Sequence, residues 1–442
     1  MARLLYTLLL TLLLPVIIIW MLWRGWRNPV HRGSLRQRLA IGLQPRKDRP
    51  LWLHAASVGE VQALAGLVRL LHQSQPQQRL LISVGTPTGV TRARDLFAAQ
   101  MQPRADGAQL VTVVLAPIDL PGAAHRFLAA NRPISGAFVE TEIWPNMIAV
   151  AARAGVPLSM VSARVSERST LRYLRFAPIL LRHTLLHIRC IGAQSAADAQ
   201  RFLRLGADPQ TVHVIGNLKF DFPLPGNIEQ QGRELRARYA TGRPLWVAGS
   251  THPGEEETCV AAQQELVNAA RAAGEIEPLL VLAPRKPQRF DEVAAWLTAR
   301  GIRFARRSSS GPAIAPGSIE VLLVDTLGEL LAFYAAADLA FVGGSLVPVG
   351  GHNLLEPAAL GKPTVTGPHS FNSPEAARLL EEANALLRVS DAKSLADTVH
   401  RLLADPVFAA AQGRRAADAV VANRGAAARA LEMIRASSPA AV

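Results

Sequence analysis

The chain has 442 residues, of which 49% are hydrophobic and 19% charged, so its length suits two to three well-packed domains. Its two cysteines, Cys190 and Cys259, lie far apart without a CxxC spacing, which argues against a disulfide framework or a zinc site and favours the reducing cytosol. The formal net charge of +14 favours an anionic partner, which could be nucleic acid, a phospholipid surface or a phosphorylated substrate.

The N-terminus carries an apolar segment followed by a basic one. Leu4–Trp23 contains 20 residues without a charge, which matches the length needed to cross a bilayer of about 30 Å. Residues 24–49 then hold eight Lys or Arg against Asp48 alone. We predict a membrane anchor helix over residues 1–24 and a basic membrane-proximal segment over 25–49, with the rest of the chain in the cytoplasm.

Alternatives to a spanning anchor remain at this stage. Pro15 and the short N-terminal tail leave open a helix that dips into the bilayer without crossing it. A buried core helix is the second alternative. A cleavable signal peptide is disfavoured, because its apolar core would be shorter and a small-residue cleavage site would follow it.

Short apolar runs of strand length recur after residue 50, with stretches of helical character between them. In the first series they lie at residues 51–53, 80–84, 110–115, 137–139, 157–161, 188–191 and 212–215. In the second series they lie at residues 245–248, 279–283, 319–324, 339–342, 363–366 and 385–389. This alternation predicts parallel sheets with helices on both faces.

The two series predict two doubly wound, Rossmann-like α/β domains, over residues 50–215 and 245–425. Residues 216–244 are rich in Gly, Pro and charge, as expected of a connection, and residues 306–318 resemble a surface loop. The alanine-rich end is expected to be helical, with 426–442 as a tail. Because ligands bind at the carboxyl ends of parallel strands, we expect a cleft between the two domains.

Residues with distinctive chemistry follow directly after predicted strands of the first domain. Glu60, in LWLHAASVGEVQA, either complements a helix dipole in a first turn or acts as a catalytic carboxylate. Glu140 and Glu142, in FVETEIWPN, fit a metal site, a substrate clamp or an ordinary solvated pair. The turns SVGTPTG and SARVSERS are rich in glycine and hydroxyl groups and fall at the same predicted edge.

The second domain shows the same placement after its first two strands. In VAGSTHPGEEE, Ser250 and Thr251 precede an acidic helix start, which suits a helix cap or a phosphate site. In VLAPRKPQRF, Arg285 and Lys286 are either solvated or part of an anion cradle together with Arg289.

The most distinctive stretch is FVGGSLVPVGGHNLLEPAALGKPTVTGP, residues 341–368. Its glycine pairs allow close backbone approach to a phosphate, and Glu356 can accept the hydroxyls of a ribose. The chain has no G-x-x-x-x-G-K-[ST] and no G-x-G-x-x-G after the first strand of either half, which argues against P-loop and dinucleotide-binding proteins. His352 has no second ligand at metal-binding spacing and is interpreted as a turn residue.

Eight motifs together resemble the 3-deoxy-D-manno-octulosonic acid (Kdo) transferases of lipid A assembly. In order along nearly the whole chain they are HAASVGE, GTPTG, ETEIWPN, ARVSERS, GNLKFD, GSTHPGEEE, APRKPQRF and GGHNLLEPAALGKP. The resemblance implies the GT-B fold, CMP-Kdo as co-substrate, no other cofactor and no metal. It also implies inverting transfer to a lipid A precursor, lipid IVA, by an enzyme held at the inner membrane with its catalytic domains in the cytoplasm.

The resemblance also implies roles for individual residues. Glu60 would be the general base that deprotonates the acceptor hydroxyl. The expected acceptor-binding residues are Ser57, Gly59, Glu140, Glu142 and Arg164. The expected donor-binding residues are Lys219, Ser250, Thr251, Arg285, Lys286, Gly350, Gly351, Asn353 and Glu356.

Three residues depart from the pattern of the resemblance, and other functions compete with it. Lys286 stands where relatives commonly have His, Ser162 where Asn is usual, and Ser373 where an aromatic residue is usual. The alternatives are another membrane-associated GT-B enzyme of nucleotide sugars and a non-catalytic protein that binds nucleotide or anionic lipid. Nucleic acid is disfavoured as a partner, because the basic excess lies beside the apolar segment without interleaved aromatic residues.

Overall fold

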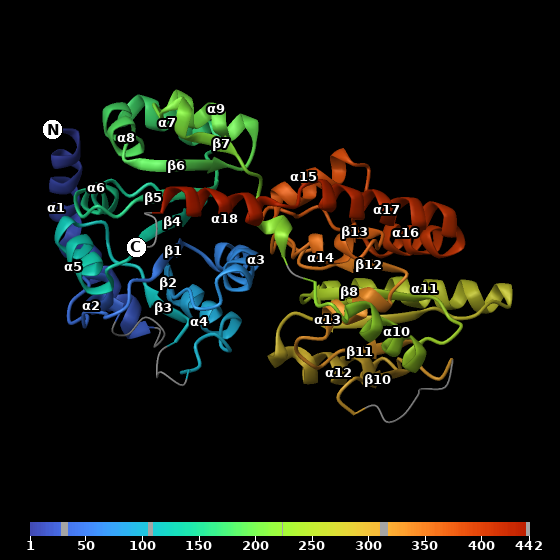
Figure 1. The fold of residues 1–442 in the computed structure, drawn as a ribbon. Coiled ribbons are helices and arrows are strands. Elements are labelled where there is room, and N and C mark those ends of the chain that lie inside the picture. Colours follow the sequence, from blue (N-terminus) through green and yellow to red (C-terminus); the bar gives the residue numbers. More distant parts are fainter. Residues whose placement is uncertain (28–33, 105–108, 223, 310–316, 439–442) are drawn as a thin grey trace. The chain divides into compact units, whose positions relative to one another are not determined.

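A computed structural model describes residues 1–27, 34–104, 109–222, 224–309 and 317–438. The chain forms two compact units, one of residues 1–223 and 423–442 and the other of residues 224–422. Each unit contains one sheet of seven parallel strands covered by helices (Figure 1). Residues 28–33 of the basic segment and 310–316 of the expected surface loop lie outside the described residues.

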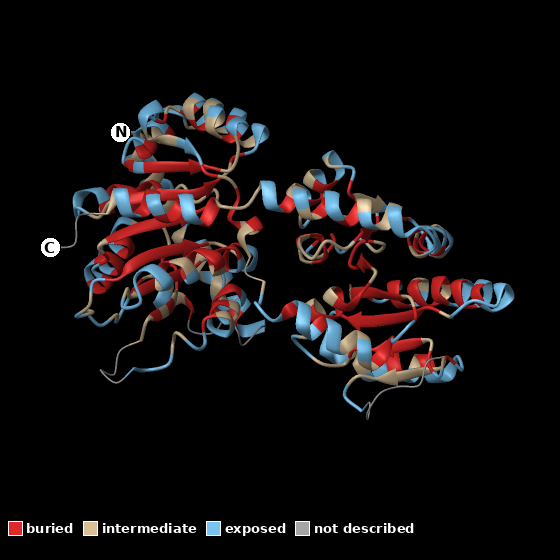
Figure 2. Cartoon of the chain, turned by 45° about the vertical axis from the view of Figure 1, so that its right-hand side comes forward, coloured by how far each residue is buried: buried red, intermediate tan, exposed pale blue. Residues whose placement is uncertain are grey.

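The first sheet has the strand order β3-β2-β1-β4-β5-β6-β7. Its strands are β1 (Leu51–Ala55), β2 (Leu80–Val84), β3 (Val111–Leu115), β4 (Ser135–Val139), β5 (Leu158–Ala163), β6 (Ile188–Ala193) and β7 (Val212–Val214). The central strands are buried on both faces (Figure 2), which explains why they read as unbroken apolar runs such as LWLHA.

Helices cover both faces of this sheet. They are α1 (Ala2–Arg27), α2 (Ser34–Arg38), α3 (Val58–Ser74), α4 (Pro87–Leu96), α5 (Pro121–Asn131), α6 (Pro145–Arg153), α7 (Glu167–Phe176), α8 (Pro178–Leu185), α9 (Ala196–Arg204) and α18 (Ala426–Ser437), with short 3₁₀ helices η2 (Pro209–Thr211) and η3 (Leu218–Asp221). One core packs α3, α4 and α18 on the sheet, and the other packs α5, α6, α8 and α9 on the opposite face.

The second sheet has the order β10-β11-β9-β8-β12-β13-β14. Its strands are β8 (Leu245–Thr251), β9 (Leu279–Pro284), β10 (Phe304–Arg306), β11 (Val321–Leu323), β12 (Leu339–Val342), β13 (Thr364–Thr366) and β14 (Leu386–Arg388). The helices of this unit are α10 (Ile228–Tyr239), α11 (Glu255–Ala273), η4 (Pro287–Arg289), α12 (Phe290–Ala299), α13 (Leu330–Ala336), α14 (Leu355–Ala359), α15 (Pro374–Glu382), α16 (Ala392–Ala404) and α17 (Pro406–Ala422).

Three elements differ from the sequence prediction. Helix α10 lies within 216–244, where composition indicated only a connection, and it packs on α13. The edge strand β10 was not predicted, because its three residues end in Arg and have no apolar run. The segment expected as a tail, 426–442, contains α18, whose apolar side chains belong to the core of the first unit; residues 439–442 lie outside the described residues.

Each sheet has one switch point, a place from which successive strands of the chain are added toward one edge of the sheet and later strands toward the other edge. In the first sheet β1 pairs with β2 on one side and β4 on the other; in the second, β8 pairs with β9 and β12. The chain leaves these neighbouring strands toward opposite faces, and in sheets of this kind ligands bind at the carboxyl ends of the strands at such a place. This switch point is where each unit is expected to bind ligands.

Candidate functional site

The switch point of the first unit gathers the acidic residues that the sequence singled out. Glu60 follows β1, while Glu140 and Glu142 follow β4, the strand that pairs directly with β1. The three carboxylates interact electrostatically, since Glu140 and Glu142 both raise the pKa of Glu60. Residues 80 positions apart in the sequence thus meet at one edge of the sheet.

Glu60 lies in the first turn of α3 and is 8% exposed. Its Oε2 accepts a hydrogen bond from the Ala56 N–H at 2.6 Å, and its Oε1 accepts one from the Ser57 hydroxyl at 2.9 Å. Ser57 is the N-cap of the helix and accepts from the Glu60 N–H. Burial outweighs these two donors and raises the pKa of Glu60 to about 7, which suits a group that exchanges protons near neutral pH.

Glu140 is held by a lysine of the same unit. Its carboxylate lies 2.6 Å from the Lys219 Nζ on η3. The backbone of Glu140 has φ +59°, a conformation that costs energy for a residue other than glycine and that often marks a functional position. Lys219, which we expected among the donor residues, therefore lies in the first unit beside the expected acceptor residues.

Glu142 is fixed by a chain of hydrogen bonds that starts inside the unit. Trp52 Nε1 donates to Ser83 Oγ at 2.7 Å, and Ser83 Oγ lies 2.8 Å from His54 Nδ1. His54 Nε2 and Trp144 Nε1 both reach Glu142 Oε2, at 3.4 and 2.6 Å.

The chemistry of the groups sets which atom donates in each of these hydrogen bonds. The Glu142 carboxylate only accepts, so His54 Nε2 carries a proton and donates to it; in the tautomer with the proton on Nε2 alone, Nδ1 accepts from the Ser83 hydroxyl. His54 is fully buried and packs edge-on against Trp144, with ring centroids 4.7 Å apart. Sequence reasoning missed this residue, although a histidine within the apolar strand LWLHA was a visible signal.

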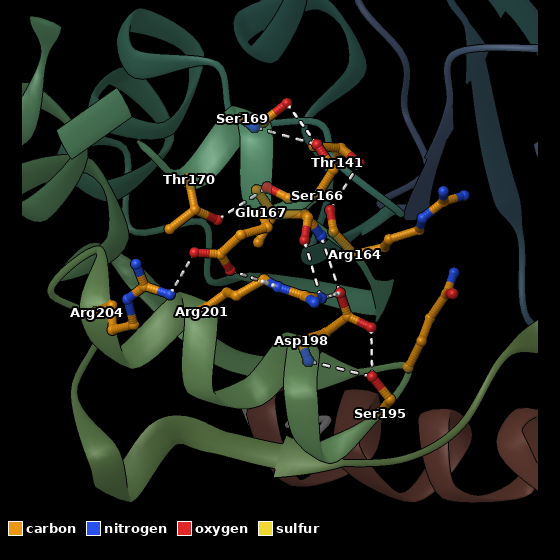
Figure 3. Close-up of polar contacts among 12 residues, drawn as sticks. Thr141, Arg164, Ser166, Glu167, Ser169, Thr170, Ser195, Asp198, Arg201 and Arg204 are labelled. Atoms are coloured by element: carbon orange, nitrogen blue, oxygen red, sulfur yellow. Dashed lines mark hydrogen bonds and ion pairs between the residues drawn. The ribbon is translucent and has the colours of Figure 1, made fainter. Parts of the chain in front are cut away.

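The neighbouring loop after β5 carries Arg164. The Thr141 hydroxyl donates to the Arg164 carbonyl at 2.7 Å, which ties this loop to the one that bears Glu140 and Glu142. Figure 3 shows the same region, where Arg201 lies between Glu167 and Asp198 and links α7 to α9. The motif SARVSERS thus supports the loop that positions Arg164.

Glycines shape the rim of the first switch point in different ways. A side chain at Gly85 would put a Cβ 2.6 Å from the Ala56 carbonyl, so glycine is required where the loop after β2 touches the loop after β1. At Gly59 a Cβ would meet only Ser57 Oγ, at 3.9 Å. Gly59 therefore leaves space beside Glu60 instead of relieving a clash.

The switch point of the second unit brings together residues that follow β8, β9 and β12. Ser250 has φ +58°, and Thr251 is 1% exposed with its hydroxyl donating to Glu256 Oε1 at 3.3 Å. Arg289 bonds the other oxygen of Glu256 at 3.4 Å. Thr251, expected to face a phosphate, is thus engaged with a buried carboxylate.

Glu255 is the centre of this second site. It is fully buried, and its two oxygens accept from four backbone N–H groups, those of His252, Gly344, Ser345 and Leu346, at 2.6 to 3.0 Å. Of the first glycine pair, where a phosphate was one expected ligand, the Gly344 N–H therefore donates to a carboxylate of the protein, and the Gly343 N–H donates to the Gly249 carbonyl. The sequence indicated residues 255–257 only as an acidic helix start, so this role of Glu255 was not predicted.

The second glycine pair and the residues after it lie on the same turn. Gly350 and Gly351 have φ +107° and +75°, and a Cβ at Gly350 would lie 2.4 Å from the Phe371 ring, so neither position accepts another residue without strain. Asn353 accepts from the Leu355 N–H at the start of α14 and donates to Glu356 Oε1, at 3.1 Å each.

Two basic side chains border the site at the end of β9. Arg285 and Lys286 are exposed, and within the part of the chain that the structure describes neither forms an ion pair. The Arg285 N–H donates to the Thr251 carbonyl at 3.0 Å, which fixes this loop beside Ser250 and Thr251. Their charges are available to an anionic ligand.

A pair of histidines joins the two sides of the second switch point. His252 Nε2 and His352 Nε2 lie 2.9 Å apart, so one ring donates and the other accepts. Burial, followed by His252 and Arg285, lowers the pKa of His352 to about 4. His352 is a turn residue as predicted, but it also links the loop after β8 to the glycine turn.

The residues described do not contain a group of three or more His, Cys, Asp or Glu side chains arranged to hold a metal ion. The predicted site residues instead form two sets, one at each switch point. The first set contains Ser57, Gly59, Glu60, Glu140, Glu142, Arg164 and Lys219. The second contains Ser250, Thr251, Arg285, Lys286, Gly350, Gly351, Asn353 and Glu356.

Comparisons with known proteins agree with these motifs. A family model described as 3-deoxy-D-manno-octulosonic-acid transferase (kdotransferase) matches residues 33–222. The chain is 39% identical over 440 residues to the 3-deoxy-D-manno-octulosonic acid transferase of Bordetella pertussis, covering 98% of this chain and 99% of that protein. It is 34% identical over 438 residues to the enzyme of the same name from Haemophilus influenzae, covering 98% of each.

A solved structure gives the fold independently. The UDP-GlcNAc 2-epimerase from Neisseria meningitidis, bound to UDP-GlcNAc, matches with a TM-score of 0.54 over 88% of this chain and 100% of that chain, at 11% identity. This likeness concerns the fold alone. It confirms the predicted class, a GT-B fold with two Rossmann-like units, here preceded by an apolar helix.

Proposed function

Because the chain belongs to the family of Kdo transferases, and is therefore a glycosyltransferase, we propose that it transfers Kdo from CMP-Kdo to the lipid A precursor lipid IVA. The observation that carries the mechanism is the placement of Glu60. A carboxylate with a pKa of about 7 lies at the switch point of the first unit, next to two further acidic residues.

In the proposed reaction Glu60 is the general base. The acceptor hydroxyl attacks the anomeric carbon of Kdo, a new C–O bond forms, and its proton passes to a Glu60 oxygen. The bond to the CMP phosphate breaks, and CMP leaves with the electron pair. Attack from the face opposite CMP inverts the anomeric centre.

The other residues act mainly by positioning the two substrates. Glu142, Arg164 and the open space at Gly59 would form the acceptor side in the first unit. In the second unit, Arg285 and Lys286 would stabilise the phosphate of the leaving CMP by charge, so that no metal is required. The glycine turn, Asn353 and Glu356 would hold the nucleotide.

The proposed location is the cytoplasmic face of the inner membrane. Helix α1 has 26 residues, an 18-residue window within it has a mean hydropathy of 2.5, and basic residues follow it. An apolar helix beside a basic segment binds anionic lipid, and the proposed acceptor is itself an anionic lipid.

Mass spectrometry of the product tests this proposal. Purified protein is mixed with CMP-Kdo and a tetra-acylated lipid A precursor, and the mass increase gives both the activity and the number of Kdo residues added. UDP-sugars serve as control donors. Turnover of a UDP-sugar alone would overturn the donor assignment, and binding of CMP-Kdo without any transfer would favour a non-catalytic binding protein.

A further inference from the structure

Helix α1 lies against the first unit. It contacts α2, α6 and α8 of that unit (Figure 1). From Arg3 onward, the residues that are not fully exposed recur at the spacing of one helix face. They are Arg3, Tyr6, Thr7, Leu10, Leu14, Ile17, Ile18, Met21 and Gly25.

The first turns of α1 make polar contacts with the globular part of the unit. The Tyr6 hydroxyl donates to Asp119 Oδ2 at 3.0 Å, and the Thr7 hydroxyl donates to Asn146 Oδ1 at 2.9 Å. Asp119 also accepts from the N–H groups of Asn146 and Met147, so it caps α6. At the other end of α1, Gly25 is buried.

These contacts are incompatible with a helix that crosses the bilayer. Thr7 and Arg24 are separated by about 25 Å of helix at 1.5 Å per residue. If Arg24 were at the cytoplasmic surface, Thr7 would lie near the opposite surface, and Asp119 and Asn146 with it. The elements packed on α1, which are α2, α6 and α8, would then be drawn into the bilayer, where a charged side chain at the centre costs about 2.5–3.5 kcal/mol. Both ends of α1 therefore belong on one side of the membrane.

The opposite face of α1 is exposed and apolar. Its most exposed side chains are Leu4, Leu5, Leu8, Leu9, Leu12, Val16, Ile19, Leu22 and Trp26, which are 55 to 76% exposed. Such a continuous apolar stripe is rare on the surface of a soluble protein. Arg24 and Arg27 at its end stack on Trp20 and Trp23, at 5.1 and 4.4 Å from the ring centroids.

The surface next to α1 has the same chemistry. Helix α8 contacts α1, and Phe176 and Ile179 at the junction of α7 and α8 are 73% and 63% exposed. Residues 168–189 contain five Arg and no Asp or Glu. Apolar side chains among arginines match the acyl chains and anionic head groups of one bilayer leaflet.

We propose that α1 is an interfacial helix that lies in one leaflet of an anionic bilayer, with both of its ends on the side of the catalytic units. One face rests on the first unit and replaces the polar face that such helices ordinarily have. The other face contacts acyl chains. This inference rests on the membrane location proposed above.

Disulfide cross-linking in membrane vesicles tests the docking of α1. The pair Thr7→Cys and Asn146→Cys replaces two side chains that touch, so mild oxidation should cross-link it. The matched control is Leu9→Cys with Asn146→Cys, because Leu9 lies on the exposed face. We expect at least about tenfold less cross-link in the control. Equal or absent cross-linking in both pairs would overturn the proposal.

Labelling of Ala2→Cys measures the position of the N-terminus without altering any contact of Asn146. An impermeant maleimide is added to spheroplasts and, separately, to lysed cells. Glu229→Cys is the control, because Glu229 lies in the second unit and its side chain is 83% exposed. The native cysteines are buried, so they should not react. We expect both variants to react only after lysis. Labelling of Ala2→Cys from outside would overturn the inference, whereas protein found in the soluble fraction would contradict the membrane location instead.

Discussion

Glu60 shows how one side chain can serve both the fold and the proposed reaction. As the third residue of α3 it accepts from Ala56 and Ser57, which is what a first-turn acid does in a capping arrangement. Those donors favour the carboxylate, while burial favours the protonated form. The two interpretations that the sequence left open therefore describe the same geometry.

The pKa of Glu60 predicts the pH dependence of the reaction. Because a base must be ionised, the transfer rate should rise with pH through about 7, the value raised by burial. Glu60→Gln should lower kcat by about 10²- to 10⁴-fold and keep CMP-Kdo binding within about twofold. A pH–rate profile measured under single-turnover conditions checks both. A Glu60→Gln enzyme that retains wild-type kcat would exclude Glu60 as the base.

Stability should change with pH in the opposite sense. The folded state holds the Glu60 proton more tightly than the unfolded state does, so wild-type stability should fall between the ordinary pKa of 4.5 and about 7, then level off. Glu60→Gln should lack this decrease. Thermal unfolding from pH 4.5 to 8 compares the wild type with Glu60→Gln. If the stability of both proteins changed with pH in the same way, the raised pKa of Glu60 would be contradicted.

His54 offers a second test at the residue scale, as a positioning residue that acts through Glu142. An Asn amide overlies the Nδ1 end of an imidazole and a Gln amide overlies its Nε2 end. His54→Asn should therefore lose the contact with Glu142 and lower kcat/KM by about 10- to 100-fold, while His54→Gln should stay within about fivefold of wild type.

A double-mutant cycle separates this positioning role from a packing role. In a Glu142→Gln background, His54→Asn should cost little more activity, because both changes act on the same carboxylate. Additive losses, or equal losses for Asn and Gln, would show that His54 matters only for packing. Ser83→Ala, which keeps the imidazole, gives a second measurement if His54→Asn folds poorly.

At the scale of elements, the glycine turn after β12 depends on Glu255 in α11. Four backbone donors converge on its buried carboxylate, so the turn is held open in one conformation before any ligand arrives. The His252–His352 contact adds a second link between the same two loops. The proposed donor site is thus shaped by a carboxylate of the protein itself.

Replacing Glu255 should weaken that turn. Glu255→Gln substitutes an amide donor for one carboxylate oxygen, leaves backbone N–H groups unpaired, and should lower stability by about 2–4 kcal/mol. Glu257→Gln is the matched control; Glu257 accepts one bond from Gly254 at the exposed helix start, so its loss should cost less than about 1 kcal/mol. Denaturant unfolding compares the two variants. Similar losses of stability would contradict the role of Glu255 in holding the turn.

The sequence predicted elements better than it predicted their contacts. All strands with apolar runs appeared where expected, because burial on both faces of a parallel sheet leaves an unmistakable pattern. Strand β10 and helix α10 were missed, since three edge residues and a charged amphipathic helix show little apolar periodicity. The His54–Glu142 and Glu255 networks could not be predicted, because they join residues about 90 positions apart through strand order alone.

At the scale of the whole molecule, the chain closes its first unit with its last helix. Asp221, at the end of η3, accepts from the N–H groups of Gly425 and Ala427 at 2.7 and 2.5 Å and so caps α18. The apolar side chains of α18 complete a core built by β1, α3 and α4. The first unit is therefore discontinuous in sequence.

Core substitutions in α18 should destabilise the first unit. Leu431→Ala removes a buried side chain and should cost about 2–4 kcal/mol, whereas Glu432→Ala, exposed on the same helix, should cost less than about 0.5 kcal/mol. Thermal unfolding of the two variants makes the comparison. An unchanged melting temperature for Leu431→Ala would show that α18 does not belong to the core.

The place of α18 in the fold also sets an order of events during synthesis. The first 223 residues leave the ribosome long before the helix that finishes their core, so this unit must wait with apolar surface uncovered while the second is translated. Translation that stops early, or a fusion that hinders the C-terminus, would leave an aggregation-prone nascent chain. Tags for expression are therefore better placed elsewhere than directly behind the last helix.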